Sequence, residues 1–137
     1  GVDGGASAGH GSLYHETRLT MLASQLLIGE PGVRAREALR LATVGGAKCL
    51  GRSGQLGELS VGAAADIVVW PVDGIYFSGF QGDLVEAWLR NGPLTVRHNI
   101  VNGKFLVKNG ELQFSDVEDK LKAHQAISDR WWKAAKA

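Results

Sequence analysis

The side chains best suited to chemistry lie within the first 16 positions of this 137-residue chain. Asp3 stands between Val2 and the pair Gly4-Gly5. Because such small neighbours let a ligand or another backbone come close, Asp3 suits a metal ligand or a proton-transfer base. An Asp-Gly pair is equally typical of an ordinary turn where a strand ends. The residues alone leave both interpretations open.

Three further titratable side chains follow: His10, His15 and Glu16. His10 lies between two glycines, so it could swing towards Asp3, or it could face solvent or cap a helix. Glu16 falls in a first helical turn, where the helix dipole favours an acidic residue without any catalytic duty. The spacings His-x-His, Cys-x-x-Cys and His-Glu-x-x-His do not accompany them. The sequence therefore shows no complete metal site.

The other candidate positions read as structural. His98 and His124 are isolated among structural residues, and the carboxylate of Asp66 can bond to a turn backbone. Ser7 has no nucleophile motif around it. Gly45-Gly46 lacks the strand, the Lys and the hydroxyl residue of a phosphate loop.

The elements that must position these residues begin with a helix. Ser12 is placed to cap it, and Gly29 and Pro31 to end it. Its spacing predicts one buried face, made of Leu19, Leu22, Ala23, Leu26 and Leu27.

A second helix is predicted over residues 35–50, with Leu50 on its buried side. Gly45-Gly46 lies inside it, which indicates either the close approach of another backbone or an early helix end. The single cysteine, Cys49, cannot form an intrachain disulfide, and we expect it to be buried. A lone, unoxidised cysteine fits a cytoplasmic protein.

After Gly51 the period changes to that of short strands, predicted at residues 55–59, 66–72, 94–101 and 104–108. Asn102-Gly103 and Asn109-Gly110 are hairpin-turn dipeptides, because both residue types tolerate positive φ. Residues 94–114 therefore read as an antiparallel meander.

Two more helices are predicted in the second half. A short one covers residues 83–91 and is stopped by Gly92-Pro93. A closing one begins with a capping box formed by Ser115 and Glu118. Its apolar stripe contains Val117, Leu121, Ile127 and Trp131.

Composition excludes two classes of partner. Fifteen basic residues against 14 acidic ones give a net charge of +1, which leaves no electrostatic footprint for a nucleic acid polymer. No apolar run approaches the roughly 20 residues that span a bilayer, so no membrane partner is expected. Trp131-Trp132 could touch a lipid surface, but its helix lacks a strongly basic face, and packing on a neighbouring domain is favoured.

The order of segments resembles the C-terminal portion of an amidohydrolase-superfamily deaminase. Within the family, the likeness is greatest to 8-oxoguanine deaminases and to the related chlorohydrolases and triazine aminohydrolases. The segments that carry it are Gly1 to Ser7 (Gly-Val-Asp-Gly-x-Ala-Ser), residues 36–43, 57–70, 83–90 and 98–112.

The resemblance implies an α/β fold. Residues 1–52 would form the C-terminal end of a (β/α)8 TIM-like barrel, with strand eight, a loop and two helices. Residues 53–115 would form part of a small composite β-sandwich, and residues 116–137 a C-terminal helix. The chain is accordingly expected to be a fragment of a longer protein, which could form a homo-oligomer.

The resemblance also implies a mechanism. Asp3 would sit at the tip of strand eight, bind a divalent metal, most often zinc, and accept the proton of the attacking water. His10 would contact the substrate at the barrel mouth, where the family often has other polar residues. The remaining metal ligands would lie upstream, so the chain alone is expected to be inactive.

Three functions stay open at this point. The leading one is deamination of a purine-like heterocycle such as 8-oxoguanine through a metal-activated water. A second, within the same superfamily, is hydrolysis of a chloro- or amino-triazine. The third is a non-catalytic, β-rich interaction module in which Asp3 only ends a strand.

Overall fold

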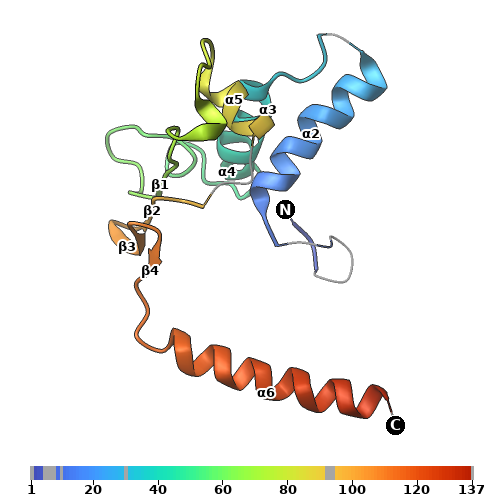
Figure 1. Ribbon diagram of the computed structural model, residues 1–137. Coiled ribbons are helices and arrows are strands. Elements are labelled where there is room, and N and C mark those ends of the chain that lie inside the picture. The colour runs from blue at the N-terminus through green and yellow to red at the C-terminus, as the bar shows by residue number, and fades with distance from the viewer. Residues whose placement is uncertain (1, 5–8, 10, 30, 92–94, 137) are drawn as a thin grey trace.

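Three helices form the centre of the molecule in the computed structural model, which describes residues 2–4, 9, 11–29, 31–91 and 95–136. These helices are α2 (Leu13–Ile28), α3 (Ala35–Arg40) and α5 (Leu84–Asn91). Figure 1 shows them gathered in one cluster, with a small sheet beside it and α6 (Val117–Ala135) standing apart at the far end. The predicted α/β class is confirmed, whereas the barrel end is not shown by these elements.

Helix α2 begins and ends where predicted, but it buries a different face. Ser12 is the N-cap residue through its carbonyl, which accepts from the backbone N–H of His15 at 3.1 Å, and its side chain makes no capping hydrogen bond. The buried residues are Tyr14, Thr17 and Met21, whereas the predicted core residues Leu26 and Leu27 are 84% and 82% exposed. The prediction was wrong for Leu26 and Leu27, because α3 and α5 pack on the Tyr14 side and no described part of the chain covers these two residues, whereas the predicted Leu22 does pack against the core.

The second helix continues through Gly45-Gly46 to Cys49. It consists of α3, a π-helical turn at Leu41–Gly45, and α4 (Gly46–Cys49). Gly45 ends the π turn and Gly46 begins α4, so the glycine pair does not end the helix. Cys49 is exposed and Leu50 is 70% exposed, so the predicted burial of both is wrong. The last turn projects beyond the core, and Ala47 is its one buried residue.

The strand predicted at residues 55–59 is wrong, because this segment is a series of turns. Gly57 has φ of +81°, a left-handed value that a strand residue does not adopt. A Cβ built on Gly57 would lie 2.6 Å from the carbonyl oxygen of Thr43. The close backbone approach that Gly45-Gly46 suggested therefore takes place at Gly57, against the π turn.

The sheet has four antiparallel strands in the order β1-β2-β3-β4. They are β1 (Ile67–Val69), β2 (His98–Val101), β3 (Lys104–Lys108) and β4 (Glu111–Leu112), so the predicted strands 66–72 and 94–101 are shortened. Both hairpin turns are confirmed. Asn102 and Gly103 have φ of 49° and 77°, and Asn109 and Gly110 have φ of 53° and 82°. Positive φ at both turn positions matches the right-handed twist of the flanking strands.

The core is helical and aromatic. Met21 on α2 and Leu89 on α5 are its largest fully buried side chains. The rings of Tyr14, Trp70 and Trp88 contact one another, with Tyr14 and Trp88 centroids 5.0 Å apart in an edge-to-face arrangement. Trp70 follows β1 directly, so this aromatic contact joins the sheet to the helices.

Helix α6 has its predicted extent but not its predicted cap. Asp116, and not Ser115, is the N-cap residue, and its carboxylate pairs with Lys120 at 2.8 Å. Apart from Val117, every described residue of α6 is exposed, including Leu121 and Trp131. In the part of the chain that the structure describes, no helix is both long enough and apolar enough to cross a membrane.

Candidate active-site residues

Asp3 is exposed and has a left-handed backbone conformation. Its φ of 63° is in the left-handed region, which Asp enters more readily than most residues, and its Oδ1 accepts from the N–H of Gly4 at 2.8 Å. Residues 2–4 form neither helix nor strand, so the predicted strand tip is not seen. A parallel barrel strand is held by hydrogen bonds to its neighbours, and the four described strands pair only with one another.

The other candidates near the start occupy different settings. His15 and Glu16 lie in the first turn of α2, and the His15 ring meets that of Tyr14 edge-on at 5.5 Å. His10, the candidate substrate contact, lies outside the described residues. The role of His10 therefore stays a prediction.

Asp66 and His98, which were predicted to be structural, both make structural contacts. Asp66 accepts from the backbone N–H of Asn102 at 2.7 Å, which ties the start of β1 to the first hairpin turn. His98 accepts through Nδ1 from the N–H of Asn109 at 3.2 Å and meets the ring of Phe105. Each side chain is thus engaged at one of the Asn-Gly turns.

Among the described residues, neither of two surface hollows is lined by a set of catalytic groups. The larger, of about 960 Å³, is an apolar groove between the start of α2, the π turn, residues 57–59, β1 and α5. Its ionisable carboxylates are those of Glu58 and Asp66. The indole Nε1 of Trp88, which lines the groove, is buried without a hydrogen-bond partner.

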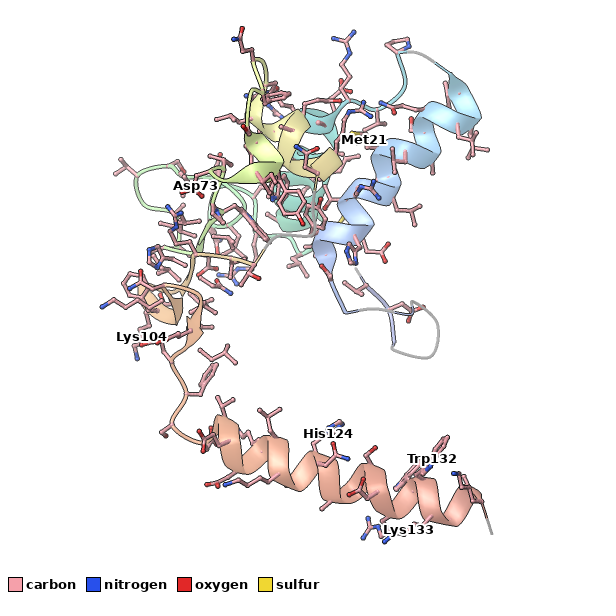
Figure 2. All side chains as sticks on the ribbon, in the orientation of Figure 1. Met21, Asp73, Lys104, His124, Trp132 and Lys133 are labelled. Carbon is pink, nitrogen blue, oxygen red and sulfur yellow. The ribbon has the colours of Figure 1, made fainter. Side chains whose placement is uncertain are left out.

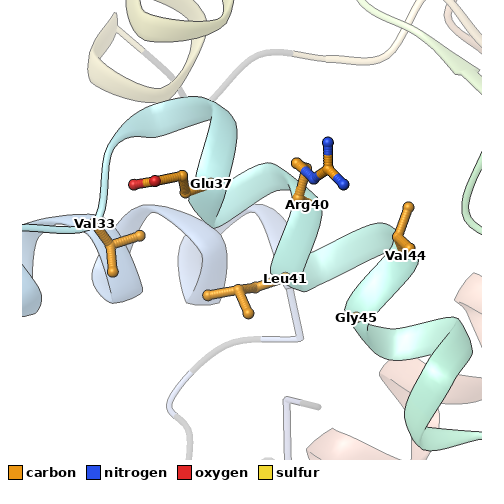
Figure 3. A pocket seen from close by; sticks show the side chains of 6 residues that line it. All are labelled: Val33, Glu37, Arg40, Leu41, Val44 and Gly45. Atoms are coloured by element: carbon orange, nitrogen blue, oxygen red, sulfur yellow. The ribbon is translucent and has the colours of Figure 1, made fainter.

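The smaller hollow, of about 430 Å³, runs along α3 and the π turn (Figure 3). Glu37 and Arg40 are its charged lining residues. The carboxylate of Glu37 accepts from the backbone N–H of Arg34 at 2.9 Å, so it acts in helix capping. The rest of the lining is apolar, as Figure 3 shows for Val33, Leu41 and Val44.

Shifted pKa values occur at structural ion pairs. The hydrogen bond from Arg36 lowers the pKa of Asp83, and the backbone N–H of Val85 lowers it further. Arg36 reaches both carboxylate oxygens, with Nη2 at 2.8 Å from Oδ1. In the same way, the hydrogen bond and charge of Arg97 lower the pKa of Asp73. Both pairs are exposed and join separate segments of the chain.

The described residues do not form a metal site by themselves. Among them, no three His, Cys, Asp or Glu side chains lie close enough to hold one ion. A catalytic zinc needs about three protein ligands and an open position. Asp3 offers one exposed carboxylate, which can ligate zinc, so the described residues supply at most part of such a site.

Sequence comparison decides the family. A sequence model of the amidohydrolase family matches residues 1–106. The chain belongs to the amidohydrolase family. The predicted membership is therefore confirmed over most of the chain's length.

Named relatives within the amidohydrolase family support this assignment. The chain is 32% identical over 128 residues to 8-oxoguanine deaminase of Pseudomonas aeruginosa, covering 93% of this chain and 28% of that protein. It is 32% identical over 123 residues to 5-methylthioadenosine/S-adenosylhomocysteine deaminase of Moorella thermoacetica, covering 87% of this chain and 28% of the relative. The chain thus spans less than a third of the length of these relatives.

A solved amidohydrolase structure shows the same local fold. A variant of atrazine chlorohydrolase from Arthrobacter aurescens, complexed with zinc and atraton, superposes with a TM-score of 0.80 at 36% sequence identity. The match covers 90% of this chain and 28% of that one. The arrangement of the described helices and strands is therefore one that an amidohydrolase adopts.

Sequence reasoning missed several contacts that build the region around the groove. The Tyr14 hydroxyl and the Arg18 guanidinium reach the end of α5, and Gly57 reaches the π turn. Residues 14 and 88 are 74 positions apart, so no local pattern links them. The contact of Gly57 with the π turn had one local signal, which was the presence of a glycine inside a predicted strand. Glycine in a strand often marks the close approach of another backbone.

Proposed function

We propose that this chain is the C-terminal portion of a metal-dependent aminohydrolase that hydrolyses a C–N bond of a purine-like heterocycle such as 8-oxoguanine. Membership of the amidohydrolase family carries the proposal. The deaminases of Pseudomonas aeruginosa and Moorella thermoacetica, each 32% identical, support the reaction type. The same membership favours an enzyme over a β-rich interaction module. The strands of the sheet are only two to five residues long, and such a small sheet also favours an enzyme over a β-rich interaction module.

Asp3 is the proposed metal ligand and proton acceptor of this chain. The proposed divalent metal, zinc, would supply a hydroxide nucleophile near neutral pH when bound. The Asp3 carboxylate would help to hold the metal and would take up the proton of the attacking water. Its exposure and the Gly4 N–H that orients Oδ1 at 2.8 Å support this role. His10, seven positions further along the chain, is the proposed substrate contact.

The proposed domain organisation follows the family. Residues 1–52 would contribute the end of the barrel, residues 53–115 part of the sandwich, and residues 116–137 the closing helix. Helix α5 comes from the middle segment, yet it packs against α2 and α3 of the first. In this arrangement the aromatic contact between Tyr14, Trp70 and Trp88 would fix the first two parts to each other.

The test uses the longest natural protein that carries this sequence. Its metal content and its release of ammonia from 8-oxoguanine, guanine and adenosine are measured before and after Asp3→Asn. We expect about one equivalent of zinc to be lost or greatly weakened, with turnover falling by a factor of roughly 100 or more. Asp73→Asn is the matched control, because Asp73 is exposed and paired with Arg97. Unchanged metal content and turnover in Asp3→Asn would contradict the role of Asp3.

The second candidate is hydrolysis of a substituted triazine. The 36% identity and TM-score of 0.80 to atrazine chlorohydrolase favour it. Parallel assays of chloride and alkylamine release from triazines, on the same preparation, separate the two candidates. His10→Ala should change the ratio of purine to triazine turnover while leaving zinc content intact. Loss of zinc in this variant would place His10 among the metal ligands instead.

A further inference from the structure

The second hairpin turn, Asn109-Gly110, is held by two consecutive residues where β2 begins. The N–H of Asn109 donates to Nδ1 of His98 at 3.2 Å, and the N–H of Gly110 donates to the carbonyl oxygen of Arg97 at 3.0 Å. The His98 ring also meets the ring of Phe105 on β3 edge-on, with centroids 5.5 Å apart. One half-buried imidazole therefore joins this turn to the strands beside it.

The first hairpin turn is held in the same way, but by a different kind of acceptor. The N–H of Asn102 donates to the carboxylate of Asp66 at 2.7 Å, and the N–H of Gly103 donates to the carbonyl oxygen of Ala65 at 3.1 Å. An ordinary carboxylate stays ionised and accepts hydrogen bonds from about pH 5 to pH 8. An imidazole nitrogen accepts only while it carries no proton. The two turns should therefore respond differently to mild acid.

A row of register partners places a cation directly opposite His98. The row crosses the whole sheet and consists of Val69, His98, Lys108 and Glu111. The Nζ of Lys108 lies 5.6 Å from the centroid of Phe105, the ring that His98 also contacts. Like charges directly opposite each other destabilise a strand pair. A proton on His98 would create such a pair with Lys108.

The other charged groups around His98 do not offset that charge. Strand β1 contains only isoleucine and valine, so it brings no titratable group. Arg97 precedes His98 and is paired with Asp73 at 2.8 Å. Figure 2 shows Lys104 on the sheet and Asp73 in the segment that leads from the sheet to the helices. The carboxylates of Asp73 and Glu111 each face a cation other than His98.

We propose that His98 is a pH-sensitive latch, a side chain that holds the β3–β4 hairpin turn while neutral and releases it when protonated. The neutral ring accepts from the Asn109 N–H through Nδ1 and carries its own proton on Nε2. When Nδ1 takes up a proton, this hydrogen bond is lost and a positive charge stands opposite Lys108. The latch is closed above about pH 7 and opens below about pH 6, the range in which a histidine side chain changes its charge.

The hairpin that His98 holds has few other contacts. Strand β4 is two residues long and pairs with β3 at two positions, and the N–H of Gln113 donates to the carbonyl oxygen of Leu106 at 2.9 Å. Figure 1 shows α6 following β4, so the latch also holds the segment that leads into α6. Loss of one neutral hydrogen bond should make local opening of this hairpin roughly fivefold more frequent.

An NMR titration of the full 137-residue chain, from about pH 8 to about pH 5.5, tests the latch. The Asn109 amide resonance should shift with the same midpoint as the His98 ring. The protection of the Asn109 amide against hydrogen exchange should fall roughly fivefold. The Asn102 amide, held by a carboxylate, is the internal control and should change in neither respect. An Asn109 amide that stays constant while His98 titrates, or an equal response at Asn102, would overturn the proposal.

Two substitutions separate the acceptor from the ring. His98→Asn keeps an acceptor oxygen near the position of Nδ1 and cannot titrate, so it should remove the pH response of Asn109. His98→Phe keeps the ring contact but removes the acceptor, so Asn109 protection should be roughly fivefold lower at both ends of the titration. His124→Phe, on the exposed surface of α6, should leave the response unchanged.

The thermal midpoint of the helical core checks that these variants are folded, because His98 lies outside that core. A pH response of Asn109 that survives in His98→Asn would show that another group titrates at the turn. Asn109 protection in His98→Phe equal to that of the natural chain near pH 8 would show that Nδ1 does not hold the turn. Either result would rule out His98 as the latch.

Discussion

The Tyr14 hydroxyl donates to the backbone carbonyl of Trp88 at 2.9 Å, which joins the first turn of α2 to the last turns of α5. The same hydroxyl lies 3.1 Å from the carbonyl of Leu89, and Nε of Arg18 donates to that carbonyl at 3.0 Å. Carbonyls in the last turn of a helix have no partner within the helix. Side chains of α2 therefore cap the C-terminus of α5, and the cationic Arg18 also suits the helix dipole there.

Tyr14→Phe should lower the free energy of unfolding by about 1–3 kcal/mol, because the ring is kept while the buried carbonyl of Trp88 loses its side-chain donor and that of Leu89 keeps only Arg18. Urea denaturation followed by circular dichroism measures this. Tyr76→Phe is the matched control, because Tyr76 is 64% exposed and should change stability by less than about 0.5 kcal/mol. Equal effects of the two substitutions would show that the Tyr14 hydroxyl does not cap α5.

Gly57→Ala should be strongly destabilising. The added methyl would lie 2.6 Å from the Thr43 carbonyl oxygen and would also sit at a φ of +81°. Gly54→Ala isolates the second effect, because Gly54 has φ of +76° and open space around its Cβ position.

Thermal unfolding compares the two glycine variants. We expect a loss of about 1 kcal/mol for Gly54→Ala from backbone strain alone. Gly57→Ala should lose about 2 kcal/mol more, because the π turn must shift. A Gly57→Ala variant no worse than Gly54→Ala would mean that the contact with the π turn is easily relaxed.

Acid should weaken the link between α3 and the start of α5. Arg36 lowers the pKa of Asp83 below its ordinary value of 3.8, so the ionised form is favoured in the folded state. A carboxyl group whose pKa is lower in the folded state than in the unfolded state stabilises the fold at pH values above its pKa in the unfolded state. This contribution is lost as the pH falls through its pKa in the folded state.

The stability difference between the natural chain and Asp83→Asn should therefore be constant above about pH 5 and shrink below about pH 4. Urea denaturation across this range measures it. Asp119→Asn, on the exposed surface of α6, serves as the control substitution. A difference that stays constant down to pH 2–3 would show that the Arg36 pair does not favour ionised Asp83.

The 137-residue chain by itself should neither bind zinc stoichiometrically nor release ammonia from 8-oxoguanine. The described residues hold no group of three metal-binding side chains. Isothermal titration with zinc and a coupled ammonia assay check this prediction. Saturable one-to-one binding that is lost in Asp3→Asn, or measurable deamination, would show that the chain assembles a site that its described residues do not reveal.

Sequence patterns predicted the local elements well where the signal was itself local. The two Asn-Gly turns fixed the hairpins because positive φ at both positions leaves few alternatives. Helices α2 and α5 were predicted from their spacing and from the glycines and prolines near their ends, and α6 from its spacing and an expected capping box. The strand predicted at residues 55–59 failed because the position of Gly57 depends on Thr43, a contact across the fold.

The candidate site was predicted less fully than the fold. Asp3 was identified from its neighbours and from the family resemblance, and the family is confirmed. The role of Asp3 needs partners from other parts of a barrel, and such partners are set by tertiary structure. The structure shows Asp3 as an exposed residue with φ of 63°, and the role itself stays a proposal.

The sequence by itself determined which segments are helical, where the hairpins turn and which family the chain belongs to, because propensity, turn chemistry and motif order are properties of neighbouring residues. The tertiary structure decided which helix faces are buried. Periodicity marked Leu26 and Leu27 for the core, yet α3 and α5 pack against Tyr14 and Met21. Burial depends on which surfaces meet, and the contacts that bring them together span many tens of residues.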